Sequence, residues 1–556
     1  MKVSFQKELG RTAKVKEVIE TLLEIRKVED KASFLSPKHP REISLFDFGL
    51  KDEFEKTLSL LKEVKKQNKK VIVYTDYDAD GITGGAILWE TLYRLGFDAL
   101  PYVPHRQKEG YGFSFEGLRK IKKLYDPGLI ISVDHGISAA QKVAFAKEEL
   151  GIPVIITDHH LKPKKLPDKA EAIFHIEALS GSGVSYFFSK AVFEALDRSK
   201  SLEDLFESDY LALASIGTIA DLVPLVGPSR SIAKYGLEAF GRTRRHGIRE
   251  LTKVSGIEGR KITPWEIGFV IAPRINAAGR LEDATDALRL LCTKKQSRAR
   301  SLAEKLSSQN RLRQNMLEAA VEKAKELLQK LYGKKLPKIL IVFDKDFHEG
   351  IIGLIAARLS EEYHRPTIVF TLSDGFLKAS ARSIKSFHIT NFLRLFENLL
   401  LEVGGHSQAA GLKIEKEKFN EFQEKAVKKA EELLKEKQLE KTLLADLKLP
   451  LQVINLDLAK AIESLQPFGV GNPEPLFFSQ GILEKASLFG KENRHLKIWI
   501  KGESGSSIEF ILFDGGDEFF RLSREAKVEI VYSLEVNRWR NREYLRGKIK
   551  HFRVLK

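Results

Sequence analysis

Sulfur-containing residues are scarce in this chain. Among its 556 residues there are one cysteine, Cys292, and two methionines. A single cysteine cannot form an intramolecular disulfide, and it excludes a zinc site built from thiolates. Such cysteine usage is typical of a reducing compartment, so we expect a cytoplasmic protein.

A long uninterrupted apolar segment is also missing. The most apolar stretch, Tyr210–Gly227, is broken by Asp221 and Pro224 and is therefore unsuited to crossing a bilayer. Met1–Lys14 carries charges throughout, unlike the apolar core of a signal peptide. We expect no membrane association.

Motifs for nucleotide binding and zinc proteolysis are absent as well. Gly81, Gly84 and Gly85 lack the spacing of a dinucleotide-binding loop, and there is no P-loop. His348–Gly353 reads HEGIIG, with Ile352 where a zinc-protease helix carries its second His. This segment is better interpreted as a close packing point or a phosphate cradle at a helix N-terminus.

Positive charge is what the chain has in excess. Lys and Arg total 92 against 76 Asp and Glu, which makes the formal net charge +16. A surplus of this size favours a polyanionic partner, namely nucleic acid, polyphosphate or an acidic membrane surface. With 43% hydrophobic and 30% charged residues, the composition is that of a folded globular protein with several domains.

The first half of the chain predicts a parallel α/β sheet. Val71–Tyr74, Leu129–Val133 and Val154–Thr157 are the expected strands, and each is followed by acidic or His residues. In such sheets ligands bind outside the carboxyl ends of the strands. The first forty-odd residues, before this sheet, predict a charged helix followed by a loop.

The second half predicts a long helix, another α/β domain and a small barrel. Gln296–Tyr332 is a charged amphipathic segment that we expect to bridge two domains. Strands are expected near Lys338–Phe343 and Thr367–Thr371, and the motif PFGVGNPEP follows at Pro467–Pro475. Five β-rich runs in the basic tail then suggest an oligonucleotide-binding (OB) barrel: Leu476–Leu488, His495–Ile500, Ile508–Phe513, Val528–Val536 and Tyr544–Val554.

Three carboxylates at alternate positions follow the first strand. In VIVYTDYDADGITGG, Asp76, Asp78 and Asp80 would repel one another strongly if they were left unpaired. A solvated acidic turn is one interpretation. A divalent-metal site is the other, because hard cations prefer clustered carboxylate oxygens.

Polar residues farther along the chain favour the metal site. Asp134 and the pair His159–His160 follow the next two strands, so the sheet would bring them beside the first cluster. Asp221 lies in the apolar context SIGTIADLVPL, where an unpaired carboxylate is costly to bury. Carboxylates with imidazole and no thiolate suit manganese or magnesium better than structural zinc.

Taken together, the motifs resemble those of the DHH phosphoesterase superfamily. DYDAD at Asp76–Asp80, VDHG at Val133–Gly136, DHH at Asp158–His160 and Asp221 resemble its four motifs. GGHSQAAG at Gly404–Gly411 resembles the signature of the DHH-associated domain, and PFGVGNPEP with the terminal barrel is similar to what the RecJ-type branch adds. The resemblance covers almost the whole chain in the same order.

The resemblance implies an α/β fold in which a parallel-sheet DHH domain is joined by a long helix to a DHH-associated α/β domain, plus a C-terminal five-stranded OB-type β-barrel. We expect an N-terminal helical extension at 1–45, the DHH domain at 46–240, a helical connector at 241–335, a DHH-associated substrate-binding domain at 336–440 and the OB domain at 441–556.

A site for two Mn²⁺ or Mg²⁺ ions is also implied by the resemblance. Asp134 would bridge the ions, and His160 would face the scissile phosphate and complete the catalytic set. Many members carry a His where Tyr74 stands, and Asp76 is expected to supply the missing ligand. Two such ions can activate a water and stabilise the leaving oxygen of a phosphodiester. The implied ligands are Asp76, Asp78, Asp80, Asp134, His159 and Asp221.

Residues with hydrogen-bond donors near turns are the expected substrate contacts of a RecJ-type enzyme. Ser380 and Arg382 suit a terminal 5′-phosphate, and Arg106 and Tyr111 offer a charge and a stacking face to the strand. For any single Arg, a surface charge network is the alternative. The expected contacts are Arg106, Tyr111, Arg274, Asn276, Arg280, Ser380, Arg382, Gly404, Gly405 and His406.

The terminal stretch Arg538–Lys556 holds eight Lys or Arg against one Glu, with Trp539, Tyr544 and Phe552 among them. A solvated barrel face is one interpretation, since barrels alternate residues in and out. A surface for single-stranded nucleic acid is the other, and we favour it, because bases stack on aromatic rings while cations neutralise phosphates.

The expected function is a metal-dependent 5′-to-3′ exonuclease for single-stranded DNA in repair and recombination. Its expected partners are single-stranded DNA and, among proteins, a single-strand-binding protein or a helicase. Two alternatives remain open. One is a DHH hydrolase for cyclic dinucleotides, short oligonucleotides or pyrophosphate, and the other is a non-catalytic DNA-binding subunit of replication.

Overall fold

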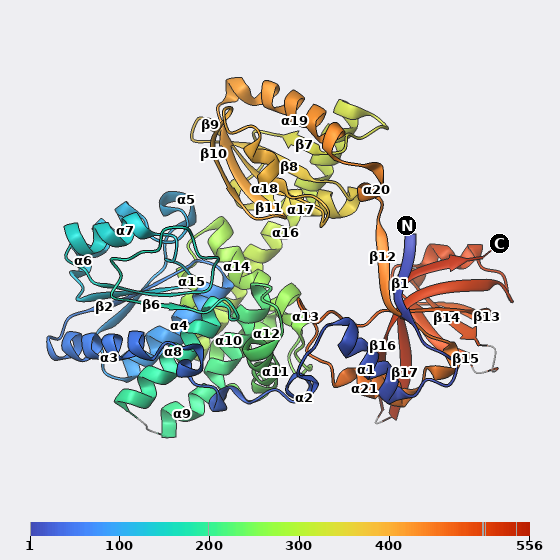
Figure 1. Cartoon of the computed structure of the whole chain (residues 1–556), viewed down its shortest axis with the longest axis horizontal. Helices are drawn as coiled ribbons and strands as arrows, with labels where there is room; N and C mark the ends of the chain where they lie inside the picture. Colours follow the sequence, from blue (N-terminus) through green and yellow to red (C-terminus); the bar gives the residue numbers. More distant parts are fainter. Residues whose placement is uncertain (1, 198–199, 503–504, 506, 541, 556) are drawn as a thin grey trace. The chain divides into compact units, whose positions relative to one another are not determined.

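The computed structural model describes residues 2–197, 200–502, 505, 507–540 and 542–555 (Figure 1). The chain divides into two compact units. One is formed mainly by residues 305–443 together with 280–282, and the other by residues 3–279, 283–304 and 444–556. Each unit is built around its own sheets.

A five-stranded parallel sheet forms the centre of the larger unit. Its order is β3 (Ala99–Tyr102), β2 (Val71–Thr75), β4 (Leu129–Val133), β5 (Val154–Asp158) and β6 (Ala172–His175). Every residue of β2, β4 and β5 is buried, which explains why these strands are continuous apolar runs. The parallel sheet expected from the sequence is confirmed.

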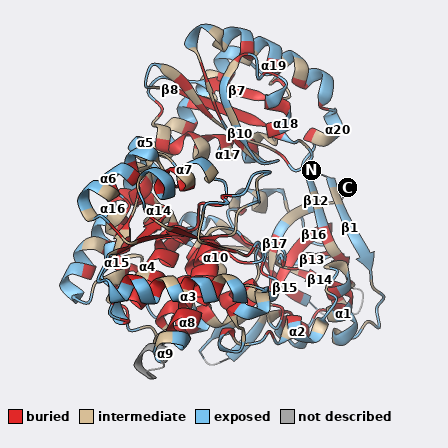
Figure 2. Cartoon of the chain, turned by 60° about the vertical axis from the view of Figure 1, so that its left-hand side comes forward, coloured by how far each residue is buried: buried red, intermediate tan, exposed pale blue. Residues whose placement is uncertain are grey.

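Helices cover both faces of this sheet. α4 (Ala79–Arg94), α8 (Gly181–Leu196) and α10 (Asp209–Ala220) pack together on one face and are almost wholly buried (Figure 2). α6 (Phe115–Tyr125) and α7 (Ala140–Ala144) bury their apolar side chains with alternate residues of β2, β4 and β5 on the other. Two-sided burial leaves the carboxyl ends of the strands as the place for polar groups.

The N-terminal segment differs from the expected helix. α1 (Val15–Ile25) forms where the apolar residues have helical spacing, but β1 (Lys2–Glu8) is a strand that lies beside β12 (Thr442–Lys448). The helical prediction is therefore wrong at residues 2–8, because the edge of a sheet far along the chain supplies backbone partners. α2 (Lys31–Leu35) and α3 (Lys51–Lys66) follow.

A series of helices connects the sheet to the rest of the chain. The long α16 (Gln296–Tyr332) coincides with the expected helix and contains the residues at which the chain passes from one unit to the other. The remaining helices of the larger unit, outside the barrel region, are α5 (Arg106–Glu109), α9 (Lys200–Glu207), α11 (Gly227–Ala239), α12 (His246–Val254), α13 (Pro264–Glu266), α14 (Ala272–Leu281, whose last residues join the smaller unit) and α15 (Thr285–Cys292).

The smaller unit is a second α/β domain with a mixed sheet. The order of its strands is β10 (Leu400–Gly405), β11 (Ala409–Ile414), β9 (Phe376–Arg382), β8 (Thr367–Ser373) and β7 (Leu340–Phe343), of which only β7 and β8 pair in parallel. Its helices beyond α16 are α17 (Ile352–Tyr363), α18 (Ile389–Arg394), α19 (Phe419–Leu433) and α20 (Glu436–Leu439).

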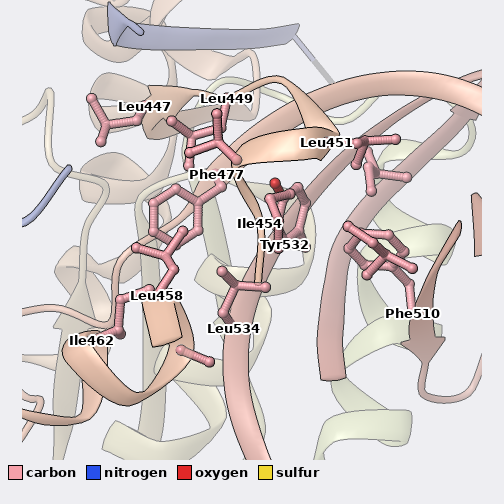
Figure 3. Close-up of a cluster of buried hydrophobic side chains, with 14 of the residues drawn as sticks. Leu447, Leu449, Leu451, Ile454, Leu458, Ile462, Phe477, Phe510, Tyr532 and Leu534 are labelled. Atoms are coloured by element: carbon pink, nitrogen blue, oxygen red, sulfur yellow. The ribbon is translucent and has the colours of Figure 1, made fainter. Parts of the chain in front are cut away.

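The C-terminal barrel has the five expected strands. β13 (Phe477–Phe489), β14 (His495–Lys501), β15 (Ser507–Leu512), β17 (Arg542–Val554) and β16 (Lys527–Trp539) pair in this order, and β16 also pairs with β13 and closes the barrel. Its core also takes apolar residues from β12 and α21 (Leu456–Glu463) (Figure 3). The OB-type architecture is thus confirmed, with β12 and β1 added at its edge.

Candidate metal centre

The carboxyl ends of β2, β4 and β5 bring the motif residues together. These strands are neighbours, and they place Asp76, Asp134 and Asp158 at one edge of the sheet. Three groups of side chains hold ligand atoms within 4.8 Å of one another, and they share members. The groups are Asp76–Asp78–Asp134, Asp134–His159–His160 and Asp80–His159–Asp221.

Backbone amides fix the two later carboxylates of the first motif. Asp78 caps α4, because its Oδ1 accepts hydrogen bonds from the amides of Asp80 and Gly81 at 2.9 and 3.1 Å. The buried Asp80 carboxylate accepts from the amides of Gly181 and Ser182, at 2.6 and 2.9 Å, where α8 begins. A helix N-terminus stabilises a carboxylate through its free amides and its dipole. This support was not predicted, although Ser180 before two glycines is a helix-capping signal.

His159 lies among the carboxylates of three different segments. Its Nε2 is 3.1 Å from Asp134 Oδ1, 3.4 Å from Asp221 Oδ2 and 3.9 Å from Asp80 Oδ2. Asp134 itself has a φ of 69°, a left-handed conformation that is uncommon outside glycine. Backbone strain of this kind persists where the surroundings over-determine it, and it clusters at functional sites.

Several buried atoms of the cluster have no hydrogen-bond partner among the residues that the structure describes. They are Asp76 Oδ1, Asp134 Oδ1 and His159 Nε2. Orphaned buried acceptors are costly, and a divalent cation would remove that cost by taking their lone pairs. The donor set of carboxylate oxygens and one imidazole, without thiolate, fits Mn²⁺ or Mg²⁺.

The pKa values of the carboxyl groups show how strongly the cluster needs positive charge. Burial, and then the neighbouring carboxylates, raise the pKa of Asp76 and Asp134 well above the ordinary value. The same causes raise the pKa of Asp78, and they raise that of Asp221 to about 8. Without metal, the cluster therefore retains protons at neutral pH.

Metal binding to this cluster should release protons. Below a pH of about 8 the Asp221 carboxyl is mostly protonated, and the proton competes with the ion for the carboxylate. Above that pH the carboxylate is free to bind the ion. We therefore expect the affinity for Mn²⁺ to rise between about pH 6 and about pH 8 and to level off above that. Calorimetric titration of the metal-free protein in buffers of different ionisation enthalpy measures the protons released. A pH-independent affinity without proton release would contradict a site made of these carboxylates.

Asp158 organises the His pair, a role that the sequence did not reveal. Its Oδ1 accepts from the amides of His159 and His160 and lies 2.8 Å from His160 Nδ1, while its Oδ2 accepts from the Ile137 amide. Although burial acts to lower it, the pKa of His160 is raised to about 9 by the hydrogen bond and charge of Asp158. His160 is thus a cation at neutral pH, and its ring is partly exposed.

Two tyrosines near the cluster have different surroundings. Tyr74 is fully buried, and its hydroxyl donates to the Gly112 carbonyl at 3.2 Å. It packs in the core and is not part of the metal cluster, whereas Asp76 is. Tyr111 is 46% exposed, and its hydroxyl lies 3.3 Å from His160 Nε2 and donates to the Asp134 carbonyl. Tyr111 therefore lies at the rim of the cluster.

Three expected substrate contacts of the larger unit are engaged by the protein itself. Asn276 Oδ1 accepts from the Ala79 amide at 2.7 Å, directly inside the first motif. The Arg274 guanidinium donates to the Val270 carbonyl, and that of Arg106 stacks over the ring of Tyr77 at 5.2 Å. For Asn276 this contact supports a role in holding the metal-binding loop, beside the expected contact with substrate.

The expected phosphate contacts of the smaller unit lie at two places. On β9, Arg382 donates to Ser380 Oγ at 3.0 Å, and a Cβ at Gly353 in α17 would lie 3.0 Å from both side chains. The missing side chain lets the first turn of α17 approach the two polar groups closely. Arg280 donates to the carbonyl of Gly350, which lies shortly before Gly353 in the chain.

The glycine pair of the smaller unit belongs to a hairpin. Gly404 and Gly405 end β10, Gly405 has a φ of 141°, and a Cβ there would lie 2.3 Å from the Ala409 carbonyl oxygen. His406 follows in the exposed turn, and its amide donates to the same carbonyl. Gly405 is therefore required by the close approach of β11, whereas a Cβ at Gly404 would meet no atom within 4 Å, and His406 is presented to solvent.

The basic terminal stretch is more neutral than its sequence suggests. Arg538 makes two hydrogen bonds with Glu463, both Arg546 and Lys548 pair with Glu535, and other cations pair with Glu474 and Glu529. Trp539 and Tyr544 remain exposed. A second aromatic surface lies on β13 and β14, where Lys485 and Lys497 stand 5.0 and 5.6 Å from the Trp499 ring.

Family models match the three expected domains. The model described as the DHH family, N-terminal domain, matches residues 70–218, the DHHA1 domain matches 336–436, and the RecJ OB domain matches 445–551. No described helix combines the length and apolar character needed to span a membrane.

Curated relatives and a solved structure are similar to almost the whole chain. The single-stranded-DNA-specific exonuclease RecJ of Haemophilus influenzae is 33% identical over 515 residues, which cover 88% of this chain and 89% of that protein. RecJ of Bacillus subtilis is 33% identical over 91% of this chain, which spans only 64% of that longer relative. The crystal structure of RecJ in complex with Mn²⁺ from Thermus thermophilus matches with a TM-score of 0.81 at 30% identity, covering 100% of this chain and 80% of that one.

Proposed function

Because this chain belongs to the RecJ family of DHH proteins, we propose that it is a metal-dependent exonuclease that hydrolyses single-stranded DNA from the 5′ end. The observation that carries this proposal is the buried cluster of carboxylates around His159, with orphaned oxygens at adjacent strand ends. Mn²⁺ and Mg²⁺ are the ions that the donor set fits.

Each residue of the cluster has a distinct task in this proposal. Asp76, Asp78 and Asp134 would hold one ion, Asp80, His159 and Asp221 would hold the other, and Asp134, which belongs to two of the ligand groups, would serve both. When bound, two such ions lower the pKa of an attacking water and neutralise the charge that develops on the phosphate. The amides of the α8 N-terminus hold the Asp80 carboxylate in a fixed orientation for this purpose.

His160 supplies a fixed positive charge beside the cluster. Asp158 holds its Nδ1 edge, and the exposed part of the ring, beside Tyr111, is left for the scissile phosphate. A cation held by a buried carboxylate is preorganised, so it stabilises developing negative charge without reorganisation during the reaction. Tyr111, in contact with His160, offers a ring to the base next to the scissile bond.

We propose that Ser380 and Arg382, beside Gly353 in the first turn of α17, recognise the 5′-phosphate. Arg382→Ala should reduce the preference for a 5′-phosphorylated end over a 5′-hydroxyl end. A charge-assisted hydrogen bond contributes about 1.5–3 kcal/mol, so the ratio of the two rates should fall by about tenfold to a hundredfold. Ser380→Ala should have a smaller effect in the same direction. Competition between the two 5′-ends in one reaction measures the ratio, and an unchanged ratio would place end recognition elsewhere.

We also propose that the barrel binds the strand, outside the DHH domain. Exposed Trp539 and Tyr544, and Trp499 between Lys485 and Lys497, combine stacking faces with positive charge. We also propose a role in cytoplasmic repair and recombination, with a single-strand-binding protein or a helicase as partner. Both would present single strands to the enzyme.

A nuclease assay tests the proposed function directly. The full-length protein is incubated with single strands labelled at the 5′ or the 3′ end, with Mn²⁺, with Mg²⁺ and with chelator. We expect mononucleotide release from 5′-labelled strands at early times, dependence on metal, and little cleavage of duplex. Early release from 3′-labelled strands would reverse the polarity. Cleavage of dinucleotides alone would instead support a small-substrate phosphodiesterase.

A further inference from the structure

The motif PFGVGNPEP, residues Pro467–Pro475, forms a rigid loop that the metal centre as described does not use. Gly469 and Asn472 bond to each other through their amides and carbonyls, at 2.8 and 3.1 Å, which closes a tight turn. The Asn472 side chain is fully buried, and its Nδ2 donates to the carbonyls of Leu465 and Pro467 at 2.7 and 2.9 Å. The loop therefore has one defined shape.

A buried arginine from the DHH domain donates hydrogen bonds to the backbone just before this loop. Arg230, in α11, is 1% exposed, and its guanidinium donates to the carbonyls of Leu465 and Gln466 at 3.0 and 2.8 Å and to that of Phe34 at 2.7 Å. Burial lowers its pKa to about 10. Its hydrogen bonds run to backbone carbonyls, so the guanidinium is fixed by the path of the chain.

The tip of the loop packs closely against the segment that follows Asp221. Val470 accepts a hydrogen bond from the Leu225 amide at 2.7 Å. Gly471 has a φ of 74°, and a Cβ there would lie 3.0 Å from Pro224 Cβ; a Cβ at Gly469 would lie 2.7 Å from Leu225 Cδ1. The glycines are what allow the backbone of the loop to approach this segment so closely.

Asp221 is held differently from Asp78 and Asp80, whose carboxylates accept hydrogen bonds from backbone amides. It follows α10 instead of a strand, and within the described part of the chain its carboxylate accepts no hydrogen bond, unlike that of Asp80. The next residue, Leu222, is 67% exposed with a φ of 61°, a strained conformation for a leucine. The direction of the Asp221 side chain thus depends on the backbone between α10 and α11.

We propose that the loop Pro467–Pro475 is a positioning element for the metal ligand Asp221. Arg230 and Asn472 set the loop, and its contacts with Pro224 and Leu225 hold the strained turn that aims Asp221 at His159, 3.4 Å away. The proposal rests on the metal centre proposed above. A segment outside the DHH domain thereby completes that centre.

The test is the Gly471→Ala variant of the full-length protein, titrated with Mn²⁺ in the absence of DNA. The added methyl group should push Pro224 and weaken binding of the ion held by Asp221 by about tenfold to a hundredfold, while the other ion binds as before. Free Mn²⁺ is followed by its paramagnetic resonance signal. In the nuclease assay, raising Mn²⁺ should restore the rate, which a general folding defect would not allow.

Gly256→Ala is the matched control, because Gly256 has a φ of 69° but a Cβ there would meet no atom within 4 Å. It carries the same backbone strain and should bind both ions normally. Arg230→Lys keeps the positive charge but loses some of the hydrogen bonds to the carbonyls of Leu465 and Gln466. It should show the same selective loss of affinity for the ion held by Asp221. Normal binding of both ions by Gly471→Ala and Arg230→Lys, equal loss of both ions, or failure of both variants to fold would overturn the proposal. A wild-type protein that binds fewer than two ions would instead overturn the metal centre.

Discussion

The Asp134→Asn variant is expected to lose about a thousandfold or more of the exonuclease rate, equivalent to about 4 kcal/mol of transition-state stabilisation. Asp134 belongs to two of the three ligand groups, and its orphaned Oδ1 lies 3.1 Å from His159 Nε2. Removing its charge should therefore weaken the binding of both ions. Steady-state rates with Mn²⁺ and Mg²⁺, and the number of ions bound without DNA, measure the two effects.

Stability provides a second readout for this variant. Burial and neighbouring carboxylates raise the pKa of Asp134 well above its ordinary value, so its surroundings in the metal-free protein favour the neutral form. Asparagine also tolerates the left-handed backbone that Asp134 adopts. We expect a metal-free melting temperature at least equal to that of the wild type, but a smaller rise when Mn²⁺ is added.

Asp126→Asn is the matched control for Asp134→Asn. Asp126 also has a positive φ, of 40°, but it is an exposed residue paired with Lys122 at the end of α6. This variant should keep wild-type activity and metal binding. Near-normal turnover by Asp134→Asn would contradict the two-metal assignment. Equal losses of activity in both variants would instead point to a backbone effect.

The His160→Gln variant is expected to lose about a hundredfold to a thousandfold in kcat while binding both ions. The loss of one preorganised group that stabilises transition-state charge has effects of about this size. Glutamine can still donate to Asp158, which keeps the buried carboxylate satisfied, but it lacks the positive charge of a His whose pKa is raised to about 9. Single-turnover rates at saturating metal isolate the chemical step.

His246→Gln controls for the substitution itself, because His246 begins α12 and lies outside the cluster. It should leave kcat and metal binding unchanged. If His160→Gln loses metal affinity in proportion to its rate, His160 is a ligand of the ions and not an electrostatic helper. An unchanged kcat would exclude both roles.

Local patterns predicted the parts of this protein that local physics controls. The runs around Val71, Leu129 and Val154 are buried on both faces and so lack polar residues, which made β2, β4 and β5 predictable. The 37 residues of α16 coincide with the expected helix, because its charged and apolar positions follow one helical period. The barrel strands were predicted from runs of strand-forming residues, which are also a local pattern.

Features that depend on distant segments were not predictable. β1 is a strand only because β12 offers a free edge, so the helix expected at residues 2–8 was wrong. The amides of Gly181 and Ser182 reach Asp80 because α8 packs on α4. The cations of the terminal stretch seemed free to bind phosphates, but carboxylates from other segments of the barrel region lie beside many of them.

The sequence by itself determined that acidic and His residues follow apolar strands, which, with the motif resemblance, was enough to predict the chemistry and the family. A strand end is a local property, and a parallel sheet brings neighbouring strand ends together whatever the loops do. Only the tertiary structure decided how each side chain is oriented: Asp158 on His160, helix amides on Asp80, and the loop Pro467–Pro475 against the turn after Asp221. The contacts on Asp80 and on the turn after Asp221 join residues remote in sequence. The Asp158–His160 contact is local, but like the others it depends on distances that no sequence spacing specifies.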